Sequence, residues 1–215
     1  MNLHTLLAQN ITKRIGDKTL LQDISLELSG GNVYGFSGEN GSGKTMLFRV
    51  LSGLVKPTEG QVLLDGHDIH RDKHLSNIGI IIENSSLWPE LTGFENLLYL
   101  SELNKRISKQ EVKDALKRVG LNPDNRLPIK KYSLGMKQRL NIAQAIMERP
   151  DFIFLDEPTN SIDSDGVVLV RRIISEESAR GAVVLLTSHI SQDISSLCQQ
   201  VYQVKAGKCY LAEGV

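Results

Sequence analysis

The stretch that decides the fold of this chain is Gly38-Glu39-Asn40-Gly41-Ser42-Gly43-Lys44-Thr45. It fits the pattern G-x-x-x-x-G-K-[ST] at every fixed position, and its glycines let successive backbone N–H groups turn toward a phosphate. An apolar run over 33–36 predicts a buried strand before it, and residues 46–51 predict a helix after it. This context disfavours the alternative of a Gly-rich turn that happens to precede a lysine. We therefore predict a phosphate site in which Lys44 pairs with the terminal phosphates and the Thr45 hydroxyl binds Mg²⁺.

The size and composition of the chain fit a globular protein without net charge. Its 215 residues suit one large domain, and 25 basic residues balance 25 acidic ones, so nothing draws the chain toward nucleic acid. Cys198 and Cys209 are too few for a disulfide scaffold and form no paired metal motif, which fits a reducing cytoplasm. We expect no signal peptide and no membrane span, because no apolar run approaches the roughly 18–20 residues that a bilayer requires. If the protein acts at a membrane, another chain does the spanning.

Strand-like and helix-like segments alternate along the chain, which predicts an α/β fold with helices covering a mainly parallel sheet. Short β-type runs extend to about Leu64, and strand character returns at 152–155 and 183–186. Between them, apolar residues recur at helical spacing. We expect a single domain, 1–215, with a nucleotide-binding core of about 1–83 and 150–215 and a helical lobe of about 84–149.

A second motif is the apolar run Phe152-Ile153-Phe154-Leu155, which ends in Asp156 and Glu157. A fully buried parallel strand has this composition, and α/β sheets bind ligands at the carboxyl ends of such strands. Beside a phosphate loop, Asp156 is predicted to lie near Mg²⁺, and Glu157 to orient or deprotonate an attacking water. Two acids that merely solvate a strand end are the alternative, which the phosphate loop disfavours.

A histidine ends another predicted strand, in the stretch Thr187-Ser188-His189. On the ligand edge of the sheet, its imidazole could donate to the γ-phosphate and help to position water. A structural or surface histidine fits the residues equally well, so both interpretations stay open.

The stretch Tyr132-Ser133-Leu134-Gly135-Met136-Lys137-Gln138-Arg139-Leu140 resembles the signature motif of ATP-binding-cassette (ABC) ATPases, usually written L-S-G-G-Q. Across nearly the whole chain the other segments then resemble the motifs of this family in their usual order: Walker A at 38–45, the Q-loop region at 78–97, Walker B at 152–157, the D-loop at 158–163 and the switch histidine at His189. The resemblance implies a P-loop NTPase core with a mainly parallel sheet, an N-terminal antiparallel β lobe and an inserted helical lobe.

The chain departs from the family pattern at several positions. Glu83 stands where the family usually has glutamine; a carboxylate can still bind Mg²⁺ or water, but it cannot donate a hydrogen bond as an amide does. Leu134 and Met136 replace residues of the commonest signature. These features resemble the ATPase subunits that drive bacitracin or lantibiotic export and immunity. Ile15 lies about where an aromatic residue normally stacks on adenine, so we expect that contact to be absent or relocated.

The resemblance also implies an active site shared between two subunits. In this family each nucleotide lies between Walker A of one subunit and the signature of the other, so Ser133 and Gly135 are expected to serve the γ-phosphate held by a second ATPase subunit, identical or different. The expected cofactors are ATP and Mg²⁺. The residues expected to hold Mg²⁺ are Thr45, Glu83 and Asp156, and the expected catalytic residues are Lys44, Glu157 and His189.

The function that the resemblance implies is coupling of ATP-driven dimer closure to a separate membrane permease, with export of a peptide antibiotic or similar cargo. The protein would then lie in the cytoplasm, on the inner face of the membrane through the permease. A short permease helix would enter the groove beside the Q-loop, where Leu87, Trp88 and Pro89 are candidate contacts; ordinary core packing is the alternative.

Cassettes that act on ribosomes or DNA form a different functional class. They usually join two cassettes in one chain or carry long coiled coils, and this chain has one cassette and no sustained heptads. A structural cassette without activity is disfavoured by the intact Lys44, Asp156, Glu157 and His189.

Two further clusters are interpreted as surface features. His67, Asp68, His70 and His74 have irregular spacing in a predicted loop, which favours a polar surface over a metal site. Basic residues over 105–118 alternate with acids at helical spacing, which indicates a solvated helix face, with contact to anionic lipid as the alternative.

Overall fold

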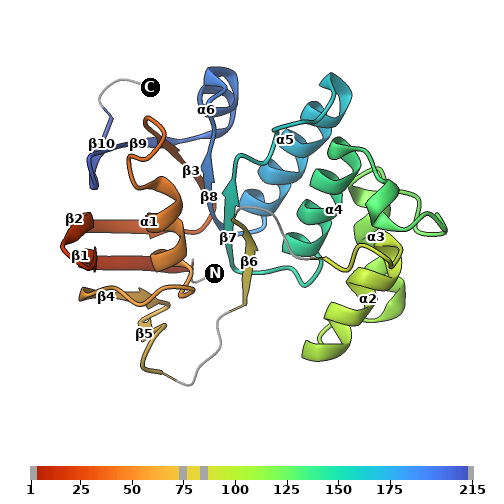
Figure 1. Ribbon diagram of the computed structural model, residues 1–215, viewed down its shortest axis with the longest axis horizontal. Helices are drawn as coiled ribbons and strands as arrows, with labels where there is room; N and C mark the ends of the chain where they lie inside the picture. Colours follow the sequence, from red (N-terminus) through yellow and green to blue (C-terminus); the bar gives the residue numbers. More distant parts are fainter. Residues whose placement is uncertain (1–3, 73–76, 83–86, 213–215) are drawn as a thin grey trace.

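The computed structural model describes residues 4–72, 77–82 and 87–212. Its fold consists of an antiparallel sheet near the N-terminus, a mainly parallel sheet, and a lobe of helices beside the parallel sheet (Figure 1). This arrangement confirms the expected fold class. Within the described ranges, no helix has the length and apolar character that crossing a membrane requires.

The antiparallel sheet has the strand order β2-β1-β4-β5. Its strands are β1 (Thr5–Ile15), β2 (Lys18–Ser29), β4 (Glu59–Leu64) and β5 (His67–Asp68). In β2, Leu26 and Leu28 are buried while Glu27 between them is exposed. This alternation is typical of a sheet with one face on the core.

The larger sheet has the strand order β10-β9-β3-β8-β7-β6. Its strands are β3 (Asn32–Ser37), β6 (Ile78–Ile81), β7 (Phe152–Asp156), β8 (Val183–Thr187), β9 (Gln200–Lys205) and β10 (Lys208–Leu211). Neighbours from β9 to β6 pair in parallel, and β10 pairs antiparallel with β9. The carboxyl ends of β3, β8 and β7 therefore meet at one edge, where loops can bring side chains together.

The parallel sheet separates two hydrophobic cores. Phe152 and Phe154 of β7 pack in the core shared with α1 (Lys44–Leu51) and the antiparallel sheet. Ile153 and Leu155 belong to the other core, which α5 (Ser164–Ala179) and α6 (Ser191–Leu197) help to form. Burial on both faces explains the unbroken apolar run of this strand.

The helical lobe contains α2 (Gly93–Asn104), α3 (Lys109–Arg118) and α4 (Leu134–Ile146), and a single 3₁₀ turn (Ile129–Lys131) precedes α4. Thr92 and Ser108 each begin a helix with a capping box, in which side chain and backbone exchange hydrogen bonds. These local signals explain why both helices start where they do.

The helix α4 rests directly on the edge strand β6. Gly79 of β6 permits this contact, because a Cβ at this position would lie 2.0 Å from the backbone oxygen of Ala145 in α4. The lobe is also tied to the core by an ion pair between Arg118 of α3 and the buried Glu177 of α5, at 2.5 Å. These contacts fix where the lobe meets the sheet.

Candidate functional site

The phosphate loop of residues 38–43 connects β3 to α1. Its glycines adopt backbone conformations that other residues rarely take, with φ of 152° at Gly38, 77° at Gly41 and 114° at Gly43. At Gly38 a Cβ would also lie 2.2 Å from the backbone oxygen of Val204. Backbone conformation therefore favours glycine at all three positions, and at Gly38 the close approach of Val204 also excludes a side chain.

Lys44 folds back over this loop. Its Nζ donates to the backbone oxygens of Gly38 at 2.7 Å and Glu39 at 3.0 Å, and the residue is 8% exposed. Both acceptors are neutral, so the positive charge can still attract an anion. Lys44 stands in the first turn of α1, where the helix dipole adds positive potential. The arrangement suits a bound phosphate.

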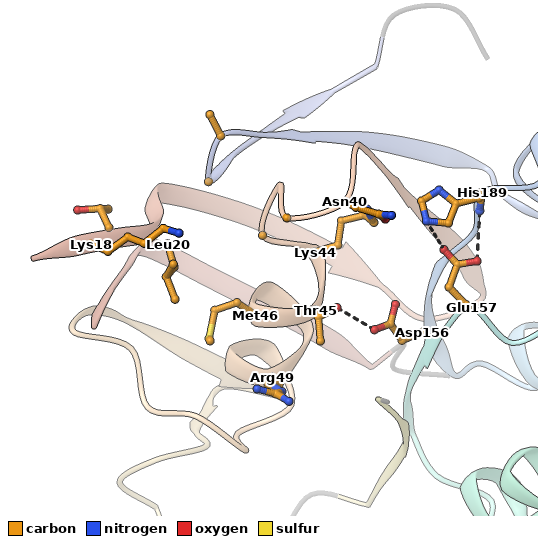
Figure 2. A pocket seen from close by; sticks show the side chains of 15 residues that line it. Lys18, Leu20, Asn40, Lys44, Thr45, Met46, Arg49, Asp156, Glu157 and His189 are labelled. Atoms are coloured by element: carbon orange, nitrogen blue, oxygen red, sulfur yellow. Dashed lines mark hydrogen bonds and ion pairs between the residues drawn. The ribbon is translucent and has the colours of Figure 1, made fainter. Parts of the chain in front are cut away.

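Thr45 and Asp156 meet at the carboxyl edge of the parallel sheet (Figure 2). Thr45 Oγ1 donates to Asp156 Oδ2 at 3.0 Å, and Thr187 Oγ1 donates to Asp156 Oδ1 at 2.5 Å. Hydroxyl and carboxylate oxygens are ligands that Mg²⁺ prefers, and two of the three expected ligands, Thr45 and Asp156, lie within hydrogen-bond distance of each other. Glu83, the third, lies outside the described residues.

Glu157 and His189 face each other beside this pair (Figure 2). His189 Nε2 lies 3.1 Å from Glu157 Oε1, and the His189 backbone N–H donates to Glu157 Oε2 at 3.3 Å. Burial raises the pKa of the Glu157 carboxyl above its usual range, and His189 partly opposes this rise. A carboxylate with a raised pKa is better matched to proton transfer near neutral pH. His189 thus lies at the site, in contact with the predicted base.

The backbone at Glu157 is in the left-handed region, with φ of 51°. This conformation costs a non-glycine residue about 1–2 kcal/mol, so surrounding contacts must hold it. The Glu157 N–H donates to Thr187 Oγ1 at 3.0 Å, and Gln138 Nε2 of α4 donates to the Glu157 backbone oxygen at 3.2 Å. These bonds aim the carboxylate at the ligand edge of the sheet.

A cavity of about 650 Å³ joins these groups, and its volume is in the range of small-molecule sites. The predicted residues that line it are Asn40, Gly41, Gly43, Lys44, Thr45, Asp156, Glu157 and His189. The rest of the phosphate loop lines a neighbouring cavity of about 370 Å³ beside β9: Gly38, Glu39 and Ser42, together with Asn40 and Gly41.

Several lining residues lie outside the predicted set. They come from the start of β2, from α1 and from the β9–β10 turn: Lys18, Thr19, Leu20, Met46, Arg49, Ala206 and Gly207. Met46 and Arg49 could have been predicted from the sequence. They lie three residues apart, so they share one face of the helix that follows the phosphate loop. The lining residues of β2 and of the β9–β10 turn reach the cavity because the antiparallel sheet folds over the phosphate loop. No local sequence pattern predicts this contact between distant segments.

Ile15 was expected near the position of the base. It is 56% exposed at the end of β1, and the described residues that line the cavity do not include it. Lys18, Thr19 and Leu20 form the wall on this side instead. Within the described part of the chain, the lining therefore offers no phenyl or indole ring for base stacking.

The signature residues lie in the helical lobe. Ser133 caps α4, and its Oγ accepts a hydrogen bond from the Met136 N–H at 3.1 Å. Gly135 lies close to the segment after β7, because a Cβ there would be 3.0 Å from the Ser161 oxygen. Among the described residues, the lining of the 650 Å³ cavity includes neither Ser133 nor Gly135. The described signature residues therefore lie outside the cavity that the phosphate loop lines.

The candidate permease contacts divide into two groups. Leu87 packs against the core of the helical lobe, as the core-packing alternative supposed. Trp88 is 44% exposed, and its ring lies 5.4 Å from that of Tyr99 in α2. Pro89 is exposed. The outer part of this segment is therefore available at the surface.

The clusters interpreted as surface features lie as follows. His67 is exposed, and its Nδ1 is 3.5 Å from Asp72. Asp68 is instead buried at the end of β5, where it accepts a hydrogen bond from the N–H of the half-buried His70; His74 lies outside the described residues. On α3, Lys117 is exposed and lies 3.5 Å from Asp114. Both thiols are free, and burial raises the pKa of each to about 12, so neither is a ready nucleophile.

Known proteins resemble the chain over almost its whole length. The family described as "ABC transporter" matches residues 21–160, more than half of the chain. The uncharacterized ABC transporter ATP-binding protein YybJ of Bacillus subtilis (strain 168) is 47% identical over 207 residues, which cover 96% of this chain and 95% of YybJ.

Two further relatives have names that specify a cargo. The bacitracin transport ATP-binding protein BcrA of Enterococcus faecalis is 38% identical over 90% of this chain and 64% of BcrA. The lantibiotic transport ATP-binding protein SrtF of Streptococcus pyogenes is 34% identical over 94% of this chain and 88% of SrtF. In fold, the chain matches a solved dimeric structure of the ATP-binding cassette MJ0796 bound to ADP and Pi, with a TM-score of 0.86 over 98% of this chain and 100% of the other, at 22% identity.

Proposed function

Because the chain belongs to the ABC transporter family of ATP-binding proteins, we propose that it hydrolyses ATP to drive a separate membrane permease. One observation carries the proposal: a single cavity joins Lys44, the Thr45–Asp156 pair and the Glu157–His189 pair. The relatives described above are named as transporter ATP-binding proteins, which favours transport over action on ribosomes or DNA.

The residues of the cavity fit ATP with Mg²⁺. The loop N–H groups and Lys44 would hold the β- and γ-phosphates, while Thr45 and Asp156, with Glu83 as a further candidate, would hold the cation. Mg²⁺, when bound, neutralises charge that develops on the phosphates. The 3.0 Å separation of the Thr45 and Asp156 oxygens supports this assignment.

Glu157 is proposed to orient the attacking water and accept its proton, and His189 to donate a hydrogen bond toward the γ-phosphate. The raised pKa of Glu157 supports proton acceptance near neutral pH. The His189 backbone N–H donates to one carboxylate oxygen of Glu157 and the His189 ring lies 3.1 Å from the other, so the histidine also limits the direction in which the carboxylate points.

The other half of the site is proposed to come from a second ATPase subunit, identical or different. Ser133 and Gly135 begin α4, and a helix N-terminus attracts a phosphate. Leu134 between them is 69% exposed, which suits a surface that a partner covers. The division of the domain into a core of about 1–83 and 150–215 and a lobe of about 84–149 belongs to the same proposal.

An exposed apolar surface on the helical lobe is proposed as the permease contact. It consists of Trp88, Tyr99 and Leu103, which are 44%, 56% and 70% exposed. Tyr99 and Leu103 lie one turn apart on α2, and Leu103 also lines a groove of about 260 Å³ between α2, α4 and β6. A short apolar helix from the permease fits this surface and would hold the protein at the inner face of the membrane.

The cargo is proposed to be a peptide antibiotic, because BcrA and SrtF bear the names of bacitracin and lantibiotic transport proteins. Co-expression with a candidate permease, chosen as a neighbouring reading frame with several apolar segments of about 20 residues, should raise the inhibitory concentration of a peptide antibiotic. Leu103→Glu should abolish that rise and the co-purification of the two proteins, because a charge at an apolar contact is costly to bury. Basal ATP hydrolysis should not change.

Tyr210→Glu is the matched control for this experiment. Tyr210 is 53% exposed on β10, at the end of the molecule opposite the helical lobe (Figure 1), and its replacement should leave both readouts intact. Co-purification that survives Leu103→Glu would place the permease elsewhere. Intact co-purification without resistance to any peptide antibiotic would contradict the proposed cargo alone.

Competition between ATP and GTP tests how the base is held. Stacking on an aromatic ring is worth on the order of 1–3 kcal/mol, and an aliphatic wall recovers only part of it. Most of the affinity should then come from the triphosphate and Mg²⁺, so ATP and GTP should bind within about 100-fold of each other, or about 2.7 kcal/mol. A stronger preference for ATP in the wild type would mean that another residue reads the base.

A further inference from the structure

A buried carboxylate outside the proposed catalytic set joins the two loops that carry Glu157 and His189. Asp193, in the first turn of α6, is 1% exposed. Its Oδ2 accepts hydrogen bonds from Thr159 Oγ1 at 2.6 Å and from Ser188 Oγ at 2.9 Å. Thr159 follows Glu157 by two positions, and Ser188 directly precedes His189. One oxygen atom therefore holds both loops.

The other oxygen of Asp193 is anchored from a third element. Arg171 of α5 donates to Asp193 Oδ1 through Nε at 2.8 Å and through Nη2 at 2.5 Å. A buried carboxylate needs a paired charge, and this guanidinium supplies it. Because Arg171 occupies Oδ1, the side chain of Asp193 is held with Oδ2 directed at the two hydroxyls.

The segment that Asp193 holds is under backbone strain. Glu157 and Ser161 both have positive φ, at 51° and 63°. Such conformations cost about 1–2 kcal/mol each in a non-glycine residue and persist where neighbouring contacts enforce them. Thr159 lies midway between the two and is 3% exposed. Its bond to Asp193 therefore restrains the middle of the strained segment.

From these contacts we propose that Asp193 is a positioning residue for ATP hydrolysis, which acts through Thr159 and Ser188 to set the orientation of Glu157 relative to His189. The inference rests on the proposed roles of those two residues. Loss of the Thr159 bond would let the segment relax, and the Glu157 carboxylate would leave its place beside His189. Nucleotide affinity, which the phosphate loop supplies, would not change.

The test compares two substitutions at Thr159. Thr159→Val removes the hydroxyl but keeps the branched shape, and it should lower kcat roughly tenfold with an unchanged KM and nucleotide Kd, since misplacement of a reacting group reduces rate rather than binding. Thr159→Ser restores the hydroxyl and should recover most of the wild-type kcat. Ser196→Ala is the matched control: it deletes an exposed hydroxyl of α6 that donates to the Gln192 backbone oxygen at 2.6 Å, and kcat should stay at the wild-type value.

A second pair of measurements separates this inference from the proposed function. In a Glu157→Gln background, Thr159→Val should change the residual rate less than about twofold, because the orientation of an inactive group has no effect. If Thr159→Val keeps the wild-type kcat while Glu157→Gln is inactive, the positioning role of Asp193 is overturned and the proposed role of Glu157 stands. An active Glu157→Gln would overturn the proposed role of Glu157 itself. A loss in Thr159→Val that serine does not restore, or that falls equally on Kd, would mark a merely structural role and overturn the inference.

Discussion

Replacing Glu157 by glutamine should lower ATP turnover by at least about 10², because loss of a general base or water-positioning group has an effect of that size. Glutamine has nearly the same shape, but it cannot accept a proton as a carboxylate does. Lys44, Thr45 and Asp156 remain in place, so the affinity for Mg²⁺-ATP should be retained. Nucleotide titration together with single-turnover hydrolysis measures the two quantities separately.

The pH dependence of the wild-type hydrolysis rate provides a second test of the role of Glu157. Glu157 acts as a base only when deprotonated, and burial raises its pKa. The rate should therefore fall on acidification at a pH above the value of about 4.3 for an ordinary glutamate. Lys44→Ala is the contrasting variant, because it should weaken nucleotide binding itself. Near-wild-type hydrolysis by Glu157→Gln would remove Glu157 from the proposed mechanism.

Mixing two inactive variants, Lys44→Ala and Ser133→Arg, should restore hydrolysis. The phosphate loop and the signature lie in different lobes, and a site shared between subunits needs one of each. In a mixed dimer, one site carries both lesions and the other carries neither. Random assortment of equal amounts should return about a quarter of the wild-type rate, and the rate per molecule should rise with protein concentration by mass action.

The control for this experiment addresses the structural role of Ser133. Its Oγ caps α4, so Ser133→Arg also removes a helix cap worth about 1 kcal/mol. Ser108→Arg removes the equivalent cap of α3 and should remain active by itself. Absence of rescue in the mixture, with concentration-independent hydrolysis by a proven monomer, would rule out the shared site.

The centre of the fold could be predicted because its signals are local. The phosphate loop and the apolar run before Asp156 carry their own spacing, and parallel pairing places Asp156 opposite Thr187. Glu157 comes one residue after Asp156, and His189 comes two residues after Thr187, so both lie just beyond these paired strand ends. The sequence placed both residues on the ligand edge of the sheet, but their contact with each other was not predicted and comes from the structure.

The remaining parts of the site depend on contacts between distant segments. Leu20 reaches the cavity because β2 lies over the phosphate loop, where a Cβ at Gly43 would be 3.1 Å from the Leu20 oxygen. Thr159 and Arg171 meet Asp193 across 34 and 22 positions of sequence, in no recurrent spacing. A polar side chain between two loops has no periodicity that would mark it as buried.

The contact of α4 with the strand backbone at Gly79 links the helical lobe to the site. Ala145 rests there, near one end of α4, while Ser133 caps the opposite end. A helix of 13 residues is about 20 Å long, so this contact lies far from the signature end of α4. Gln138 of the same helix bonds the Glu157 backbone oxygen, so a side chain at position 79 that pushed α4 away from β6 would also disturb the site.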